Sequence, residues 1–308
     1  TELVAKQKAA GLPLLTDGEF RRSYWHLDFM WGLQGIERRA SREGYQFHDE
    51  ETTADTAVVT GPVSGENHPF VEHFKFVNAL SDENHIARQT IPAPIQTFAE
   101  VTLDRCDGQT EILRAVYPTD EALADAIAAA YRQVIADLYK AGCRNIQFDD
   151  CTWGMYCDTT FAAQIGLKPD DIQKICELGV RLNNAAIEDQ PDDLAINTHV
   201  CRGNYHSTYA FEGSYDPIAP YLFAKENARA FYLEFDTPRA GGFESLAHIA
   251  DGKYVVLGLV TSKLPGLEDK ETVKARIAEA SKYVPLDHLC LSPQCGFASC
   301  EIGNKLTE

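Results

Sequence analysis

The sequence is poor in basic side chains. It has 28 lysine and arginine residues against 46 aspartate and glutamate residues, which gives a formal net charge of −18. Because this balance repels a polyphosphate backbone, we expect no nucleic acid among its partners. The chain also lacks an apolar run of about 18 to 20 residues, the length that crosses a bilayer, so we expect no membrane partner. Residues 1–11 predict an amphipathic helix rather than a signal peptide, which favours a cytoplasmic protein.

Domain linkers and nucleotide-binding loops are missing as well. No low-complexity tract, internal repeat or linker rich in Pro, Gly or Ser interrupts the chain, and we expect residues 1–308 to form one domain. No G-x-G-x-x-G follows a predicted strand and no phosphate loop with lysine is present, which disfavours a nucleotide-binding sheet.

The nine cysteines do not form the dense, even framework of a small secreted domain, and we expect reduced thiols. Four of them are expected to be buried as small apolar side chains: Cys106, Cys143, Cys176 and Cys290. Three more are left undecided at this point: Cys151, Cys157 and Cys300.

Short apolar runs rich in Val, Ile and Leu recur along the chain and are typical of buried parallel strands. They lie at residues 12–19, 57–63, 88–94, 145–150, 194–201, 232–236, 254–260 and 289–295. Helical patterns occur between most of them, at 119–143, 169–188 and 268–283, with Thr119 suited to an N-cap and Gly142 to a stop. This alternation predicts an α/β fold, the (β/α)₈ TIM barrel.

Two stretches depart from a regular barrel. The chain begins with a helix where a barrel begins with a strand, and we therefore expect the first barrel strand to be missing. No helix of good periodicity separates residues 12–19 from 57–63, and we expect residues 44–66 to form a β-rich excursion outside the barrel.

Polar side chains end the predicted strands, and strand ends meet at one mouth of a TIM barrel. His199 and Cys201 stand two residues apart at a strand end, where such side chains point to the same side. Glu234 and Cys295 end two other strands. An imidazole, two thiolates and a carboxylate form a tetrahedral set suited to zinc. Taken singly, Glu234 fits an ion pair and Cys295 a core thiol, so the argument rests on their joint placement.

Five segments together resemble the catalytic half of cobalamin-independent methionine synthase, especially its shorter single-barrel relatives. The segments are TDGEFRR (16–22), IQFDD (146–150), THVC (198–201), YLEFD (232–236) and LSPQCGF (291–297). The resemblance implies one Zn²⁺ held by His199, Cys201, Glu234 and Cys295. It also implies an enzyme that transfers a methyl group to the thiol of homocysteine, forming methionine. The zinc would bind that thiol and lower its pKa from about 8.5, so that a thiolate attacks the methyl carbon.

The same resemblance implies that Glu19 and Asp149 hold the ammonium of homocysteine. Charge supports this, because an ammonium in a desolvated site needs carboxylate partners. Asp150 is a further candidate, but neighbouring strand residues face opposite ways, so at most one of the two aspartates should reach the mouth, and we favour Asp149. The relatives bind the substrate carboxylate with a Gly-Ser turn that we cannot locate.

Arginines and tryptophans supply further candidates for substrate contact. Arg21, Arg22 or Arg202 could clamp the substrate carboxylate, although we expect at least one of the three to be exposed at the surface. Three tryptophans could stack on a flat methyl donor, although core packing is commoner for this residue: Trp25, Trp31 and Trp153.

The methyl donor stays open between a methyl-folate and a methyl-corrinoid protein. In full-length methionine synthases a histidine after the seventh strand protonates the folate leaving group, and alignment on Pro265 places Val260 at that position. Valine cannot transfer a proton. His206 is a substitute acid, or else the donor is a methyl-corrinoid protein that requires no acid.

Two other functions remain possible from the sequence. The same barrel resembles enzymes that transfer alkyl groups to another thiol such as coenzyme M, but a sulfonate calls for Arg and Lys where Glu19 and Asp149 stand. Alternatively, the metal is structural or absent and the chain is a non-catalytic binding barrel, a possibility that Val260 keeps open. Metal content together with exchange at an open coordination position distinguishes the non-catalytic barrel from the two zinc enzymes.

Overall fold

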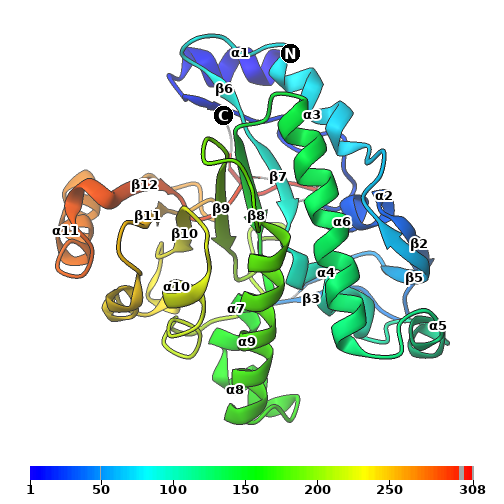
Figure 1. Ribbon diagram of the computed structural model, residues 1–308. Helices are drawn as coiled ribbons and strands as arrows, with labels where there is room; N and C mark the ends of the chain where they lie inside the picture. Colours follow the sequence, from blue (N-terminus) through cyan, green and yellow to red (C-terminus); the bar gives the residue numbers. More distant parts are fainter. Residues whose placement is uncertain (49, 298–301, 307–308) are drawn as a thin grey trace. The chain divides into compact units, whose positions relative to one another are not determined.

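A computed structural model of the chain describes residues 1–48, 50–297 and 302–306 (Figure 1). Helices and strands alternate along it in an α/β arrangement. Two compact units can be distinguished. The first comprises Thr1–Tyr45, Thr52–Phe148 and Leu182–Ile196, and the second Gln46–Glu51, Asp149–Arg181 and Asn197–Glu308.

Six strands are hydrogen-bonded in the order β12-β11-β10-β9-β8-β7. Their bounds are β7 Gln89–Pro92, β8 Asn145–Asp149, β9 Ala195–Val200, β10 Ala230–Glu234, β11 Tyr254–Val260 and β12 Leu289–Pro293. Strands β8 and β9 begin in the first unit, where the Ala195 N–H donates to the Arg144 carbonyl at 3.0 Å. They end in the second unit, where the Asp150 N–H donates to the His199 carbonyl at 2.8 Å. All six were predicted from the apolar runs, and β11 has its predicted bounds.

The first unit contains two small two-stranded sheets besides these strands. Strand β1 (Leu14–Leu15) pairs in parallel with β6 (Ile86–Ala87), so the run at 12–19 yields only a short strand. Strand β2 (Gln34–Ala40) pairs with β5 (Asp55–Ser64) in the antiparallel direction. The prediction that residues 57–63 form a parallel strand is therefore wrong. The apolar run reports burial, and Ala57, Val58 and Val59 are indeed buried, but burial does not determine the direction of the pairing.

Helices of the first unit are α1 Glu2–Ala9, α2 Leu27–Gly32, α3 Phe70–Asn78, α4 Pro94–Thr102, α5 Gln109–Val116 and α6 Asp120–Lys140. The longest, α6, begins where the sequence predicts, because the Thr119 hydroxyl accepts the Ala122 N–H at 3.2 Å. Its end is also local in origin: Gly142 has a φ of 100°, a conformation that favours glycine.

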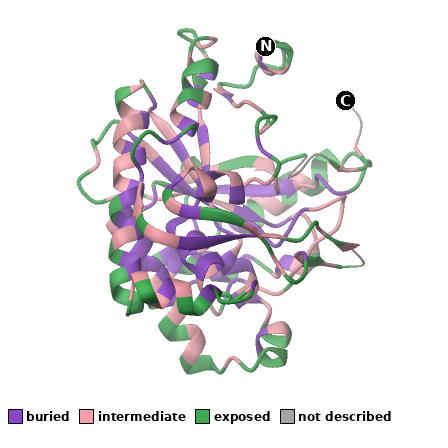
Figure 2. Cartoon of the chain, turned by 90° about the vertical axis from the view of Figure 1, so that its right-hand side faces the viewer, coloured by how far each residue is buried: buried purple, intermediate pink, exposed green. Residues whose placement is uncertain are grey.

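The second unit contains the helices α7 Thr152–Cys157, α8 Thr159–Gln164, α10 Leu222–Lys225 and α11 Lys270–Ala280, and most of α9 Pro169–Ala186. Strands β9 to β12 run parallel, with His199 opposite Tyr232 and Glu234 opposite Gly258. An aromatic core lies between these strands and helices, with Trp153, Tyr215 and Phe231 fully enclosed. Figure 2 shows the resulting pattern, with buried residues along the strands and exposed residues on the outer faces of the helices.

The expected β-rich excursion at residues 44–66 is present. It contains β5 and a second antiparallel pair, β3 (Gln46–Phe47) with β4 (Glu50–Glu51). Both pairs form sheets separate from the six-stranded one. Among the helices that the structure describes, none combines the length and the apolar character needed to cross a membrane.

Candidate metal centre

Three side chains of metal-ligand type converge in the second unit: His199, Cys201 and Cys295. One potential ligand atom from each lies within 4.8 Å of the others, and the two Sγ atoms are 3.6 Å apart. A tetrahedral zinc ion with Zn–S distances near 2.3 Å separates its sulfur ligands by about 3.8 Å. The chemistry and the spacing of this donor set therefore fit zinc.

Backbone hydrogen bonds place these ligands. His199 and Cys201 follow one another with period two at the end of β9, as the alternation of a strand requires. The Gln294 N–H donates to the Val260 carbonyl at 2.8 Å, which fixes the segment after β12 against the end of β11. The carbonyl of Gln294 lies 3.3 Å from Nε2 of His199, so that Cys295 is held beside the imidazole.

A close approach of α7 closes the other side of Cys201. A Cβ added at Gly154 would lie 2.2 Å from the Cys201 carbonyl oxygen, a distance that no side chain tolerates. Glycine at this position is therefore required for the first turn of α7 to pack against the ligand-bearing segment. The Asp150 carboxylate accepts the Thr152 N–H at 3.2 Å and so orders the start of the same helix.

Hydrogen bonds within the centre separate the charges of its members. Burial opposes a charged imidazole, yet hydrogen bonds to Asp149 and Cys295 raise the pKa of His199 well above its usual value. Hydrogen bonding with Cys201, supported by the His199 charge and opposed by burial, lowers the pKa of Cys295 well below that of an ordinary thiol. Hydrogen bonds with Cys151 and Cys295 raise the pKa of Cys201. A Cys295 thiolate beside a protonated His199 is thus the favoured charge state when no metal is bound.

Asp149 contacts the metal-ligand group directly. Its Oδ1 accepts a hydrogen bond from Nδ1 of His199 at 3.0 Å, which leaves Nε2 as the nitrogen available to a metal. Carboxylates in this position orient metal-bound histidines in many proteins. The family resemblance assigns Asp149 to the substrate ammonium, and its contact with His199 was not predicted from sequence.

Glu234 is fully buried, but it is not a member of the 4.8 Å group. Its carboxylate accepts the Arg202 N–H at 3.3 Å and lies 3.3 Å from Nη2 of Arg239. Arg239 also lies 3.5 Å from Asp236. The predicted fourth ligand is therefore held by two arginine residues, one of which directly follows Cys201.

Glu19 belongs to the first unit. Its Oε1 accepts hydrogen bonds from the Arg22 guanidinium at 3.0 Å and from the Thr90 hydroxyl at 2.9 Å. Its φ of 59° is unusual for a residue with a side chain and indicates backbone strain. Strain of this kind is concentrated at functional sites.

The other substrate candidates are mostly enclosed. Asp150 is fully buried, and Trp153 lies in the aromatic core with 1% of its surface exposed. Trp25 and Trp31 are half-buried in the first unit, and the Trp31 indole N–H donates to the Thr56 carbonyl.

Of the three arginines proposed as carboxylate clamps, Arg22 and Arg202 are buried and Arg21 is exposed, as expected for at least one of them. Arg21 lies over the Phe76 ring at 4.3 Å. Arg22 is buried and forms an ion pair with Glu19 at 3.0 Å. Arg202 is fully buried, lies 4.0 Å from the Tyr215 ring and donates to the Gly213 carbonyl at 2.8 Å.

His206 lies in a turn of the second unit, where it has a φ of 46°. Its Nδ1 and Oε1 of Glu50 are 2.6 Å apart, and about a third of its side chain is exposed. Val260 is the last residue of β11.

The described cysteines are all free thiols. Cys106, Cys143 and Cys176 are buried as predicted. Of the cysteines left undecided, Cys157 is buried and Cys151 is half-buried. The prediction for Cys290 is wrong, since this residue is exposed on β12, whose side chains are more accessible than those of the other parallel strands. Cys300 lies outside the described residues.

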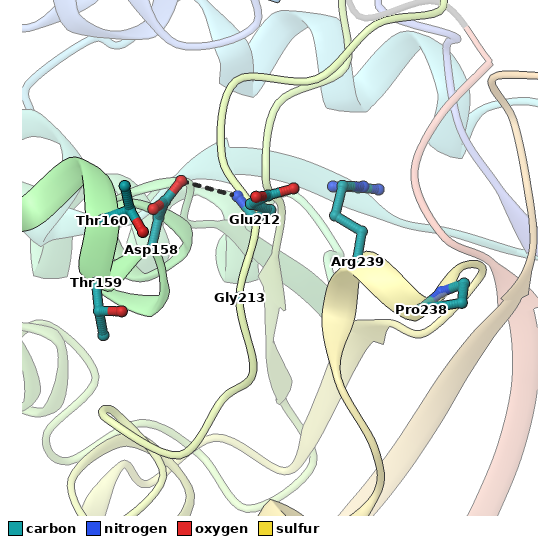
Figure 3. Close-up of a pocket in the computed structure, with 7 residues that line it drawn as sticks. All are labelled: Asp158, Thr159, Thr160, Glu212, Gly213, Pro238 and Arg239. Atoms are coloured by element: carbon teal, nitrogen blue, oxygen red, sulfur yellow. Dashed lines mark hydrogen bonds between the residues drawn. The ribbon is translucent and has the colours of Figure 1, made fainter.

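A separate polar pocket of about 300 Å³ opens in the second unit (Figure 3). It is lined by Asp158, Thr159, Thr160, Glu212, Gly213, Pro238 and Arg239. Figure 3 shows the Glu212 backbone bonded to Asp158 and the Arg239 side chain at the pocket wall. None of the three converging metal-ligand residues lines this pocket. Among the lining residues, Arg239 contacts Glu234, the predicted fourth ligand.

Lys263 is a buried cation that was not predicted from the sequence. Lys263 follows β11, has 6% of its surface exposed, and its Nζ has no hydrogen-bond partner in the described part of the chain. A polar residue just beyond a strand end was the available signal, but it does not show in sequence whether the side chain is buried.

Comparisons with known proteins agree with this fold. Residues 1–306 match the family model of the cobalamin-independent synthase catalytic domain. The protein YxjG of Bacillus subtilis is 41% identical over 310 residues, which span 99% of this chain and 79% of YxjG. A Listeria monocytogenes structure assigned as a vitamin B12-independent methionine synthase is 36% identical, with a TM-score of 0.72 over 98% of this chain and 80% of that one.

A B12-independent methionine synthase from Shewanella sp. W3-18-1, solved with selenomethionine, shares the fold at 23% identity, with a TM-score of 0.72 over 97% of this chain and 80% of that one. The parallel strands of the present chain therefore belong to a fold of the TIM-barrel type. The chain belongs to the cobalamin-independent synthase family, whose methionine synthases are methyltransferases, and carries the catalytic domain of that family.

Proposed function

We propose that the chain is a zinc-dependent methyltransferase that methylates the thiol of homocysteine to form methionine. One observation carries the proposal: His199, Cys201 and Cys295 bring three ligand atoms within 4.8 Å of one another inside a cobalamin-independent synthase domain. Zinc bound there would supply a positive charge that lowers the pKa of a substrate thiol.

The protein groups around the ligands have separate roles in this proposal. Asp149 holds the His199 ring through Nδ1, so that Nε2 would be the nitrogen that binds a metal. The Gly203 N–H donates to Sγ of Cys201 at 3.2 Å and stabilises negative charge on that sulfur. Glu234 or the substrate sulfur would complete the ligand set, and the Arg202 backbone N–H holds Glu234 by donating to its carboxylate. Glu19 is proposed to bind the substrate ammonium.

Methionine formation tests the proposal. Zinc-loaded protein is incubated with homocysteine and with methyl-folate, methylcobalamin or a methyl-corrinoid protein, and methionine is measured together with metal content. We expect one zinc per chain and methionine formed with at least one donor. Cys201→Ser should abolish both the zinc and the product, whereas Cys143→Ser, at another buried thiol, should preserve them. Product formed at an undiminished rate by metal-free protein would contradict the proposal.

We further propose that His206 is the acid when the donor is a methyl-folate. Nδ1 of His206 contacts Oε1 of Glu50 at 2.6 Å, so Nε2 is the ring nitrogen that would face the donor. Positioned acids contribute typically about 10²- to 10⁴-fold to a rate. His206→Ala should therefore slow turnover with methyl-folate but not with a methyl-corrinoid protein. Equal effects on both donors would exclude this role.

The whole of residues 1–308 is proposed to act as one catalytic domain in the cytoplasm. The chain passes repeatedly between its two units, and one family model covers residues 1–306 without interruption. The described cysteines are free thiols, which is consistent with a reducing compartment.

A further inference from the structure

Lys263 is a buried ammonium without a hydrogen-bonding partner. Its Nζ is enclosed, and no acceptor among the described residues lies within hydrogen-bonding distance. An unpaired charge in such a position costs several kcal/mol of desolvation. Such a group is stable only when an anion or water completes its interactions, so its surroundings indicate what binds there.

The backbone next to Lys263 is tied to the metal-ligand segments. The Ser262 N–H donates to Oε1 of Gln294 at 2.5 Å, and Gln294 directly precedes Cys295. Asn304 donates to the Ser262 carbonyl at 2.7 Å and to Asn204 at 3.0 Å. Asn204 in turn donates to the Gly296 carbonyl at 2.7 Å. The turn after β11, the segment after Cys201 and the segment around Cys295 are therefore one connected structure.

Two more buried polar groups of this structure are unsatisfied. Oγ of Ser262 and Nε2 of Gln294 have no hydrogen-bond partner among the described residues. The amide of Gln294 is a donor and the hydroxyl of Ser262 can be one. Together with the Lys263 ammonium, the turn after β11 and Gln294 thus carry three unsatisfied donors, and the Ser262–Gln294 hydrogen bond connects the two segments. Donors without acceptors favour an anionic ligand.

Hydrogen bonds place the turn that carries Lys263 beside the segment that carries Cys295. The Gln294 N–H donates to the carbonyl of Val260, the last residue of β11, at 2.8 Å. Within the turn, the Lys263 N–H donates to the Thr261 hydroxyl at 3.2 Å. Gln294 also lies against the candidate metal centre, because its carbonyl is 3.3 Å from Nε2 of His199.

Other buried cations of the second unit are already occupied. Arg239 pairs with Glu234 and Asp236, and Arg202 lies on the Tyr215 ring and donates to Gly213. Among the described residues of this unit, Lys263 is the buried lysine or arginine whose side chain forms no hydrogen bond.

We propose that Lys263, assisted by Ser262 and Gln294, binds the anionic group of the thiol substrate while its sulfur is at the metal centre. This rests on the proposed function and deepens it by assigning a residue to the substrate carboxylate. A sulfonate on the thiol would be recognised by the same chemistry, so the experiment distinguishes the two anions.

Calorimetric titration of zinc-loaded protein tests the assignment with three thiols: homocysteine, homocysteine amide and coenzyme M. Loss of one hydrogen bond to a charged group weakens binding by about 10- to 100-fold. We expect wild-type protein to bind homocysteine that much more tightly than its amide. Lys263→Met should remove this preference by weakening homocysteine binding alone, and Lys263→Arg should retain part of it.

Lys282→Met, at an exposed lysine, is the matched control and should leave every affinity unchanged. Zinc content and thermal unfolding are measured for each variant. If Lys263→Met does not fold, the role of Lys263 is tested by comparing the affinities for homocysteine and its amide in wild-type protein and in Lys263→Arg.

The possible outcomes separate the inference from the function. Equal binding of homocysteine and its amide by wild-type protein, or a preference that persists in Lys263→Met, overturns the role of Lys263 while methyl transfer to homocysteine stands. Tight binding of coenzyme M alone, lost in Lys263→Met, supports Lys263 and overturns homocysteine as the substrate. Failure of all three thiols to bind overturns both.

Discussion

At the scale of single residues, the contact between Asp149 and His199 gives a carboxylate control over a metal ligand. The hydrogen bond to Nδ1 fixes the ring orientation and the tautomer that presents Nε2. Asp149→Ala should therefore lower zinc affinity by about 10- to 100-fold, as removal of such partners commonly does. Competition with a chromogenic chelator measures this. Unchanged zinc affinity would mean that Asp149 serves the substrate alone.

Glu19 is predicted to behave differently, because it lies in the first unit and contacts Arg22 and Thr90 rather than a metal-ligand residue. In Glu19→Gln the zinc content should stay at one per chain, while homocysteine binding weakens by about 10-fold through loss of a charged hydrogen bond. Metal analysis and calorimetry on the same preparation check both statements. Loss of zinc would refute the proposed division of roles.

The residue scale also shows what sequence can and cannot reveal. His199, Cys201 and Cys295 were identified because strand alternation and family resemblance both point to them. The hydrogen bond of Glu234 with the Arg202 backbone and the isolation of Lys263 depend on contacts between segments far apart in the chain. No local pattern reports whether a buried charge has a partner.

At the scale of elements, the approach of α7 to the end of β9 depends on Gly154. An added methyl group would meet the Cys201 carbonyl at 2.2 Å, so one of the two backbones must move. Gly154→Ala should lower the free energy of unfolding by about 1 to 3 kcal/mol, the usual range for overpacking. Zinc affinity should fall with it, because Cys201 moves.

Gly266→Ala is the control for this change, since a Cβ there meets nothing within 4 Å. Denaturant unfolding and zinc titration of both variants provide the comparison. Equal stability of Gly154→Ala and wild-type protein would show that α7 does not constrain the ligand segment.

Elements were predicted best where local chemistry decides their limits. The start of α6 follows from the Thr119 hydroxyl, and its end follows from Gly142. Strand β5 was located correctly but assigned the wrong direction, because its partner β2 shows no alternation strong enough to be recognised as a strand. Pairing between strands is a property of two segments, and one sequence read segment by segment does not contain it.

At the scale of the whole molecule, two buried histidines link folding to pH. Burial, opposed by a hydrogen bond to the Phe29 carbonyl, lowers the pKa of His68 to about 4. Burial first, and then the Arg105 charge, lower the pKa of His26 to about 3. The geometry at His68 requires a neutral ring, because Nδ1 accepts the Phe70 N–H at 3.2 Å while Nε2 donates to the Phe29 carbonyl at 2.9 Å.

The sign of the pH effect follows from proton uptake. In the unfolded chain a histidine binds a proton below about pH 6.5, whereas His68 in the folded protein binds one only near pH 4. The unfolded state therefore gains protons first, and the stability that neutral His68 contributes above pH 6.5 is lost as the pH falls from 6.5 towards 4. Each such histidine contributes at most about 1.4 kcal/mol per pH unit to that slope. Denaturant unfolding of zinc-loaded protein between pH 4.5 and 7 should show a shallower slope for His68→Gln than for wild-type protein. His248→Gln, at an exposed histidine, should leave the slope unchanged. Identical slopes for all three proteins would show that folding does not shift the pKa of His68.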